Sequence, residues 1–166
     1  MNISRHLNVF QQATAQLNKT LHKEKQLHAA TGIYLESVFL KLYKLSWLNQ
    51  TPDPLTAPSR IFFSIWINEK CMEESKLMYN IHALKLRQLK GYSITSRQFA
   101  DDFRKAFKPF EKRWPNVSTS FGPLTLMEGW VKLDAASLAD DVLKLARQFL
   151  EIDHLIDELL EKHRKD

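Results

Sequence analysis

The residues best suited to binding chemistry form a basic segment in the middle of the chain. Residues 76–114 hold ten Lys and Arg residues against three Asp and Glu residues, a net charge of +7 in a chain whose total is +5. Tyr92, Phe107, Phe110 and Trp114 are interspersed among them. Cationic side chains neutralise acidic groups, and aromatic rings stack on bases. The predicted basic binding face consists of Lys85, Arg87, Lys90, Arg97, Arg104, Lys105, Lys108, Lys112 and Arg113.

This segment favours a non-enzymatic intracellular interaction module whose basic central face contacts an acidic partner. The partner is an unidentified protein or a second copy of the chain. Nucleic acid is the alternative partner, although the sequence carries no helix-turn-helix, zinc-finger or RNA-binding signature. A further interpretation treats the charges as an ordinary solvated helix face that balances residues 115–166, where six basic and ten acidic residues give a net charge of −4.

Catalytic chemistry has little support in the residue pattern. Cys71 lies in the acidic stretch NEKCMEES, which raises the pKa of a thiol and disfavours the nucleophilic thiolate. The chain has no nucleophile elbow, phosphate loop or paired Cys-x-x-Cys, and it holds only four glycines. We predict no catalytic residue and no cofactor. A small enzyme without a recognisable motif, built on scattered residues such as His82, Asp101 and Glu128, is the remaining alternative.

Two groups of residues have spacings that a metal site could use. Glu151 and His154 match the Glu-x-x-His spacing of metal-binding helical bundles, but such sites need a second copy of the motif, and none is present. His22, Glu24 and His28 form a looser group, in which the two histidines are too far apart around a helix to chelate one ion. We therefore expect no metal site.

The chain shows the signs of a cytoplasmic protein that does not enter a membrane. Its first residues, MNISRHLNVFQQ, lack the apolar run of a secretory signal. The densest apolar stretch, residues 32–48, is interrupted by Glu36, Lys41 and Lys44 and falls short of a membrane span. The single cysteine excludes an internal disulfide, as is usual in a reducing compartment.

The elements that position these residues begin with a predicted helical region at residues 1–48. Apolar residues from Ile3 to Leu21 recur at three- and four-residue spacing. Beyond Gly32, the stripe of Leu35, Val38, Leu42 and Leu45 continues that spacing and predicts a second, largely buried helix. Three prolines in NQTPDPLTAPSR then end the helical region.

The centre of the chain, residues 60–133, reads as a mixed α+β unit. Alternation in RIFFSIWIN predicts a strand, and PLTLMEGWVKLD predicts another, in which Gly129 marks a bulge or a close contact. Thr95 and Gln98 match a capping box, which predicts the start of a helix that ends near Pro109. Residues 77–89 are ambiguous between helix and strand, and we favour a strand because a third strand stabilises the small sheet.

The residue pattern of the C-terminal part predicts one long helix over residues 135–164, with Asp134 as its N-cap. Its seam repeats at alternating spacings of four and three, which is typical of a coiled coil. We expect this helix to pack along the N-terminal one, with self-association through the seam as the alternative. The predicted fold is a single α+β domain, residues 1–166, with long N- and C-terminal helices packed together and a small antiparallel sheet with one covering helix between them. The seam consists of Leu138, Val142, Leu145, Phe149, Ile152, Ile156 and Leu159.

Overall fold

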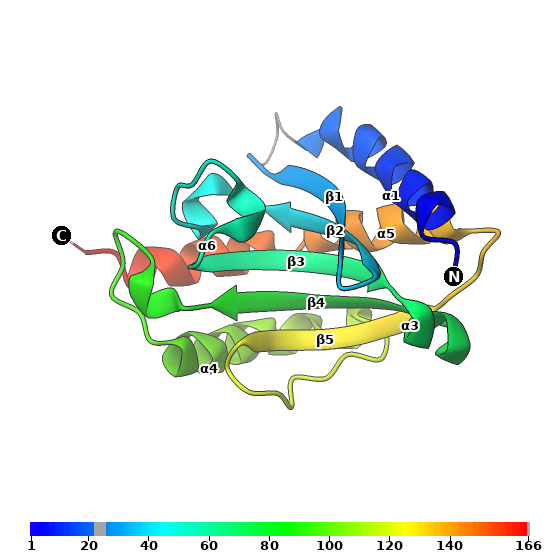
Figure 1. Ribbon diagram of the computed structural model, residues 1–166. Helices are drawn as coiled ribbons and strands as arrows, with labels where there is room; N and C mark the ends of the chain where they lie inside the picture. The colour runs from blue at the N-terminus through cyan, green and yellow to red at the C-terminus, as the bar shows by residue number, and fades with distance from the viewer. Residues whose placement is uncertain (22–25, 166) are drawn as a thin grey trace.

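The computed structural model describes residues 1–21 and 26–165 as a five-stranded antiparallel sheet with helices packed against one of its faces (Figure 1). The strands lie in chain order, each next to the one before it. In Figure 1, α5 and α6 pass behind the strands, and the opposite face of the sheet is turned toward the viewer. The strands are β1 (His28–Tyr34), β2 (Ser37–Tyr43), β3 (Arg60–Ile67), β4 (Lys76–Leu84) and β5 (Thr125–Lys132).

The helices come from both ends of the chain and from the connections between strands. α1 packs against β1, β2 and α5, while α4 packs against β5 and α6. The α+β class and the antiparallel sheet are therefore confirmed, whereas the covering layer contains several helices rather than the one predicted. The helices are α1 (Ile3–Asn18), α3 (Glu69–Glu74), α4 (Ser96–Phe107), α5 (Leu138–Phe149) and α6 (Asp153–Lys162).

The prediction of a helical region over residues 1–48 is wrong beyond α1. Residues 28–43 form the β1–β2 hairpin, and only a short 3₁₀ turn, Leu45–Trp47, follows it. Val38 and Leu42 fit a strand as well as a helix, because their neighbours Phe39 and Tyr43 make both faces apolar. Two members of the predicted stripe show the error directly: Leu35 is 80% exposed and Leu45 is 58% exposed.

The long C-terminal helix is also a partial error, since it breaks into α5 and α6 at residues 150–152. Every residue of the predicted seam is buried, so the buried face was assigned correctly. The packing of the terminal helices is confirmed for α5, which lies against α1, whereas α6 lies against α4. Asp153 and Asp157 of α6 both form ion pairs with Lys44, which directly follows β2, and these ion pairs tie α6 to the sheet.

The centre of the chain follows the sequence pattern closely. The ambiguous residues 77–89 are a strand over most of their length, because β4 spans Lys76–Leu84 and pairs with both β3 and β5. Thr95 caps α4 by accepting a hydrogen bond from the Gln98 backbone N–H at 3.2 Å, and the helix ends at Phe107, two residues before Pro109. Asp134 instead accepts from the Ala136 N–H in the turn before α5, and Ser137 takes the N-cap position.

Gly129 marks a close contact, as predicted. A Cβ atom at this position would lie 2.6 Å from Cζ of Tyr79, which packs on β5 from the neighbouring strand. The Tyr79 hydroxyl passes over Gly129 and donates a hydrogen bond to the carbonyl of Pro115 at 2.8 Å. Across the parts of the chain that the structure describes, no helix has the length and apolar composition needed to cross a membrane.

Candidate functional site

The face of the sheet opposite the helices presents its side chains in rows that run across the strands. Cross-strand pairing places Lys41, Ser64, Asn80 and Glu128 in one polar row. The row on one side of it is largely aromatic and consists of Phe39, Trp66, Met78 and Trp130. On the other side, Phe62 pairs with His82 and meets Tyr43 edge-on at a ring distance of 5.3 Å. A band of polar groups thus crosses an otherwise aromatic surface.

A groove of about 330 Å³ follows this open face. Its volume falls at the lower end of the range of small-molecule sites, about 300–1,000 Å³. The tip of the β1–β2 hairpin forms one wall through Tyr34 and Leu35, which are 68% and 80% exposed. None of the lining residues is acidic. The groove is lined by Tyr34, Leu35, Ser37, Phe39, Lys41, Arg60, Ser64, Trp66, Asn80, His82 and Leu84.

Lys41 and His82 bring two titratable groups into this groove. The Lys41 ammonium lies over the rings of Phe39 and Phe62, at 4.6 and 5.2 Å from their centroids. Burial, followed by the charge of Arg60, lowers the pKa of Lys41 below that of an ordinary lysine. Burial also lowers the pKa of His82, and the charges of Lys41 and Arg60 add to the effect. Both shifts report positive charge gathered in a poorly solvated place.

Arg60 is the third cationic group, at the start of β3. Its Nη1 donates a hydrogen bond to the carbonyl of Ala57 at 2.7 Å, which fixes the side chain against the β2–β3 connection. A guanidinium carries five N–H donors in one plane, so this bond leaves others available to a ligand. The groove therefore combines a permanent cation with two groups whose charge depends on pH.

Asn80 supplies a polar group to the centre of the groove. Its Nδ2 donates to Glu128 Oε1 at 3.3 Å, and because a carboxylate only accepts hydrogen bonds, this contact fixes the orientation of the amide. Its Oδ1 is buried and has no hydrogen-bond partner within the described part of the chain. Ser64 lies directly opposite on β3.

The basic binding face predicted from the sequence is spread over several elements. Eight of its nine residues are exposed, and the ninth, Arg104, is half-buried. Arg104 donates hydrogen bonds to the backbone carbonyls of Phe121, Gly122, Thr125 and Leu126, so it braces the turn before β5. Its role is visible only in the structure, because no sequence pattern reports a contact with a distant turn.

Four of the exposed members of this face line three separate hollows. Arg87 lies beside Tyr92 and Lys165, while Lys105 and Lys108 lie beside Thr119 on the outer side of α4. Lys108 also forms an ion pair with Glu111 at 3.5 Å. The structure thus distributes these charges rather than gathering them around one hollow.

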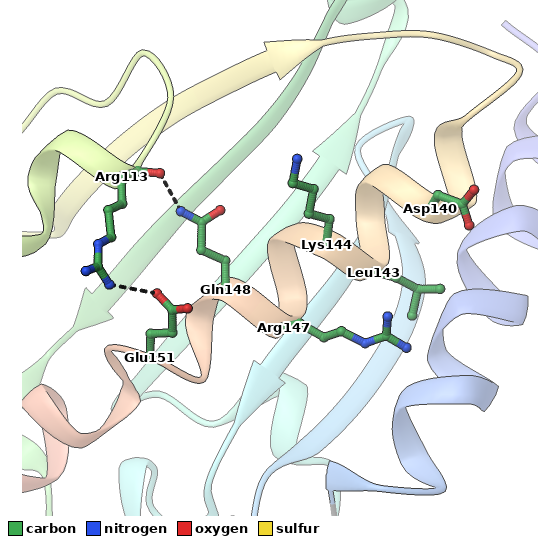
Figure 2. A pocket seen from close by; sticks show the side chains of 7 residues that line it. All are labelled: Arg113, Asp140, Leu143, Lys144, Arg147, Gln148 and Glu151. Carbon is green, nitrogen blue, oxygen red and sulfur yellow. Dashed lines mark hydrogen bonds and ion pairs between the residues drawn. The ribbon is translucent and has the colours of Figure 1, made fainter.

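Arg113 belongs to a third hollow, which runs along α5 (Figure 2). Its Nη1 lies 3.7 Å from Glu151 Oε2, and Gln148 Nε2 donates to its carbonyl at 2.6 Å. Figure 2 shows Lys144 and Arg147 of the same hollow pointing in different directions from α5. Because Asp140 and Glu151 offset two of its three cations, this hollow has less unbalanced positive charge than the sheet groove.

The other residues singled out from the sequence have ordinary structural surroundings. Cys71 is buried, and its burial is the main cause of the raised pKa of its thiol. Glu151 pairs with Arg113 while His154 meets the ring of Phe110, and the described residues contain no group of three or more metal-ligating side chains. His22 and Glu24 lie outside the described residues. His28 stacks on Tyr43 on the open face of the sheet.

The sequence analysis did not identify Lys41 and Arg60, which are the lysine and the arginine that line the groove. For Lys41 the error followed from the second helix predicted beyond Gly32, within the helical region of residues 1–48, which hid the alternation that brings Lys41 to the same face as Phe39. A lysine within the strand-like pattern SVFLKLY was the available signal, since both of its neighbours are fully buried. No protein-family model matches the chain, and searches of curated proteins and of solved structures likewise return no match.

Proposed function

We propose that this protein binds a small organic anion with a flat apolar body in the groove on the open face of the sheet. The observation that carries the proposal is the set of Lys41, Arg60 and His82, three cationic or protonatable groups in a groove without an acidic lining residue. An anion placed among them relieves their mutual repulsion. Two opposite charges about 4 Å apart near a protein surface attract each other by roughly 4 kcal/mol. The cost of removing both groups from water reduces this gain.

The apolar half of the groove accounts for the rest of the ligand. Trp66 is half-buried and Phe39 lies next to it across β2 and β3, so a flat ring has an apolar surface to contact. Apolar surface removed from water contributes about 25 cal/mol per Å². Leu84 and the hairpin residues Tyr34 and Leu35 extend this surface along the groove. The proposed ligand is therefore an aromatic or similarly flat anion.

This proposal narrows the sequence-based hypothesis of an interaction module with an acidic partner. The partner becomes a small molecule, and the cationic groups become those of the groove. The basic face of residues 85–113 and the cytoplasmic location remain predictions. Binding of single-stranded nucleic acid to the sheet is less well supported, because stacking of successive bases needs several exposed rings, and Tyr43 and Phe62 are at most 7% exposed.

The test uses two matched aromatic probes, 2-naphthoate and the neutral 2-naphthylmethanol. Calorimetric titration of the intact protein is expected to detect the carboxylate and to show at least tenfold weaker binding of the alcohol. Amide spectra should place the perturbation on β2, β3 and β4. A short single-stranded DNA serves as the third titrant. Tighter binding of the DNA than of the carboxylate would favour the nucleic-acid alternative.

Variants then locate the site. Lys41→Met and Arg60→Met are each expected to weaken naphthoate binding at least fivefold. Lys144→Met removes an exposed lysine on α5 and is the matched control, so its affinity should equal that of the unmodified protein. Equal binding of acid and alcohol, or equal losses in all three variants, would contradict a site in the groove.

A further inference from the structure

Two lysines three residues apart differ in the groups that surround their amines. Lys44 forms ion pairs with Asp157 and Asp153 on the helix-covered side of the sheet. Lys41 has no ion pair with the described acidic residues, and its Nζ faces the rings of Phe39 and Phe62 inside the groove. The two amines are therefore close in sequence and opposite in environment.

The environment of Lys41 favours a reactive amine. An ammonium ion has no lone pair, so a lysine acts as a nucleophile only in its neutral form. Burial and a neighbouring cation both disfavour the charged form, and Lys41 has both, in its partly buried position in the groove and in Arg60. Burial also disfavours the charged form of Lys44, but its contacts with Asp157 and Asp153 outweigh this effect and raise its pKa.

We propose that the Lys41 amine forms an imine with an aldehyde or ketone that carries an anionic group. This inference rests on the proposed function, since the groove must first hold the anion. Arg60 and His82 line the same groove and supply positive charge for the anionic group, while Phe39 and Trp66 contact its apolar part. The carbonyl carbon then stands in the same groove as Nζ.

The reaction needs no oxidant or reductant. The Nζ lone pair attacks the carbonyl carbon to form a C–N bond, and the carbonyl π electrons move to the oxygen, which takes up a proton. The nitrogen loses a proton to solvent, which reaches the amine through the open groove. The carbinolamine oxygen then takes up a second proton from solvent and leaves as water as the C–O bond breaks, the nitrogen lone pair forms the C=N bond, and the nitrogen loses its remaining proton to solvent. The net change is one amine and one carbonyl converted to one imine and one water.

The experiment traps this imine in the intact protein. The protein is incubated at neutral pH with 4-formylbenzoate and sodium cyanoborohydride, which reduces an imine to a stable secondary amine. Peptide mass spectrometry then gives the labelling rate of each lysine. Lys41 is expected to be labelled at least tenfold faster than Lys44 and Lys144, which provide internal controls in the same sample. Methyl 4-formylbenzoate has the same aldehyde without the charge and should lose the preference for Lys41.

A charge-conserving variant separates the two proposals. Lys41→Arg keeps a cation in the groove but removes the nucleophile, so it should still bind the non-reactive 4-methylbenzoate while losing the fast-labelling site. If 4-methylbenzoate binds and Lys41 reacts no faster than Lys144, the imine is excluded and the anion site stands. If 4-methylbenzoate and naphthoate both fail to bind the unmodified protein, both proposals are overturned.

Discussion

The two faces of the sheet treat polar side chains in opposite ways. On the covered face, Lys44 is held by Asp157 and Asp153, and Trp47 Nε1 donates to Asp157 Oδ1 at 2.8 Å. On the open face, Lys41 lies over aromatic rings, and Asn80 Oδ1 has no hydrogen-bond partner among the residues described. Lys41 lies within β2 and Lys44 follows it directly, so the two lysines differ in the face of the sheet that they occupy and not in the strand that carries them.

Polar groups that are paired within the protein stabilise the fold, whereas unpaired polar groups remain available to a ligand. A buried polar group without a partner costs about 1–3 kcal/mol, and natural proteins retain few of them. On the covered face, Lys44 and Trp47 are paired with acidic residues of α6, as expected for residues that hold a helix in place. The open face keeps unbalanced charge and an unpaired acceptor beside a groove, which is the arrangement expected of a binding surface.

The largest expected effect is on the covered face. Lys44→Met leaves Asp153, which is 1% exposed, without its ion pair to Lys44 in a poorly solvated place. Removing one partner of a buried ion pair costs about 3–5 kcal/mol, so urea denaturation should show a loss of this size in the free energy of unfolding. Lys41→Met is the matched control on the open face. Equal losses in the two variants would mean that the faces do not differ.

Two glycines give the next comparison, because each lies under an aromatic ring on a different face. A Cβ at Gly129 would lie 2.6 Å from Tyr79 Cζ and 3.0 Å from the Pro115 carbonyl oxygen, both held by the Tyr79 hydrogen bond. Gly129→Ala should therefore cost about 1–3 kcal/mol through overpacking. A Cβ at Gly32 would lie 2.7 Å from Phe39 Cζ, but this ring borders the groove and has no polar group through which a hydrogen bond could hold it.

Gly32→Ala should accordingly cost less than about 1 kcal/mol, since alanine also suits a strand better than glycine does. Paired denaturation curves of the two variants check the difference. A larger loss for Gly32→Ala than for Gly129→Ala would show that the open face is as tightly packed as the covered one.

Lys41→Met is expected to have a smaller effect of the opposite sign. The folded-state pKa of Lys41 is lowered, so keeping this side chain charged at neutral pH reduces stability. Replacing it with methionine should raise the free energy of unfolding by about 0.5–1 kcal/mol, in the range of stabilising single substitutions. Denaturation and naphthoate titration of the same sample should thus show a more stable protein that binds less. A destabilised Lys41→Met protein would contradict unbalanced charge on the open face.

Local patterns predicted much of this fold. Alternation found β3 and β5, the Thr95 cap and Pro109 bounded α4, and the four-three spacing identified a seam that is buried throughout. These features depend on residues close together in the chain. The hairpin was missed because Phe39 and Tyr43 make both faces apolar, so that Val38 and Leu42 fit both periodicities.

The candidate site depended on information that the sequence does not display. Lys41, Arg60 and His82 come from three strands, and only the register of β2, β3 and β4 brings them to one groove. The break between α5 and α6 has a similar origin, since neither proline nor glycine marks it and its acidic residues meet Lys44 from a distant strand. Both features are set by tertiary contacts, which outweigh local preference.

The smallest expected effect is a pH dependence of opposite sign in stability and in binding. The pKa of His82 in the free folded protein is below the unfolded value of 6.5, so its contribution to stability is complete above that value and is lost as the pH falls through the folded-state pKa. A bound anion favours the imidazolium and raises this pKa, so naphthoate affinity should increase over the same fall in pH.

Urea denaturation and calorimetry between pH 8 and 5.5 (about the range in which histidine titrates) measure both trends. His82→Gln should flatten both trends. Affinity that falls on acidification would remove His82 from the anion site.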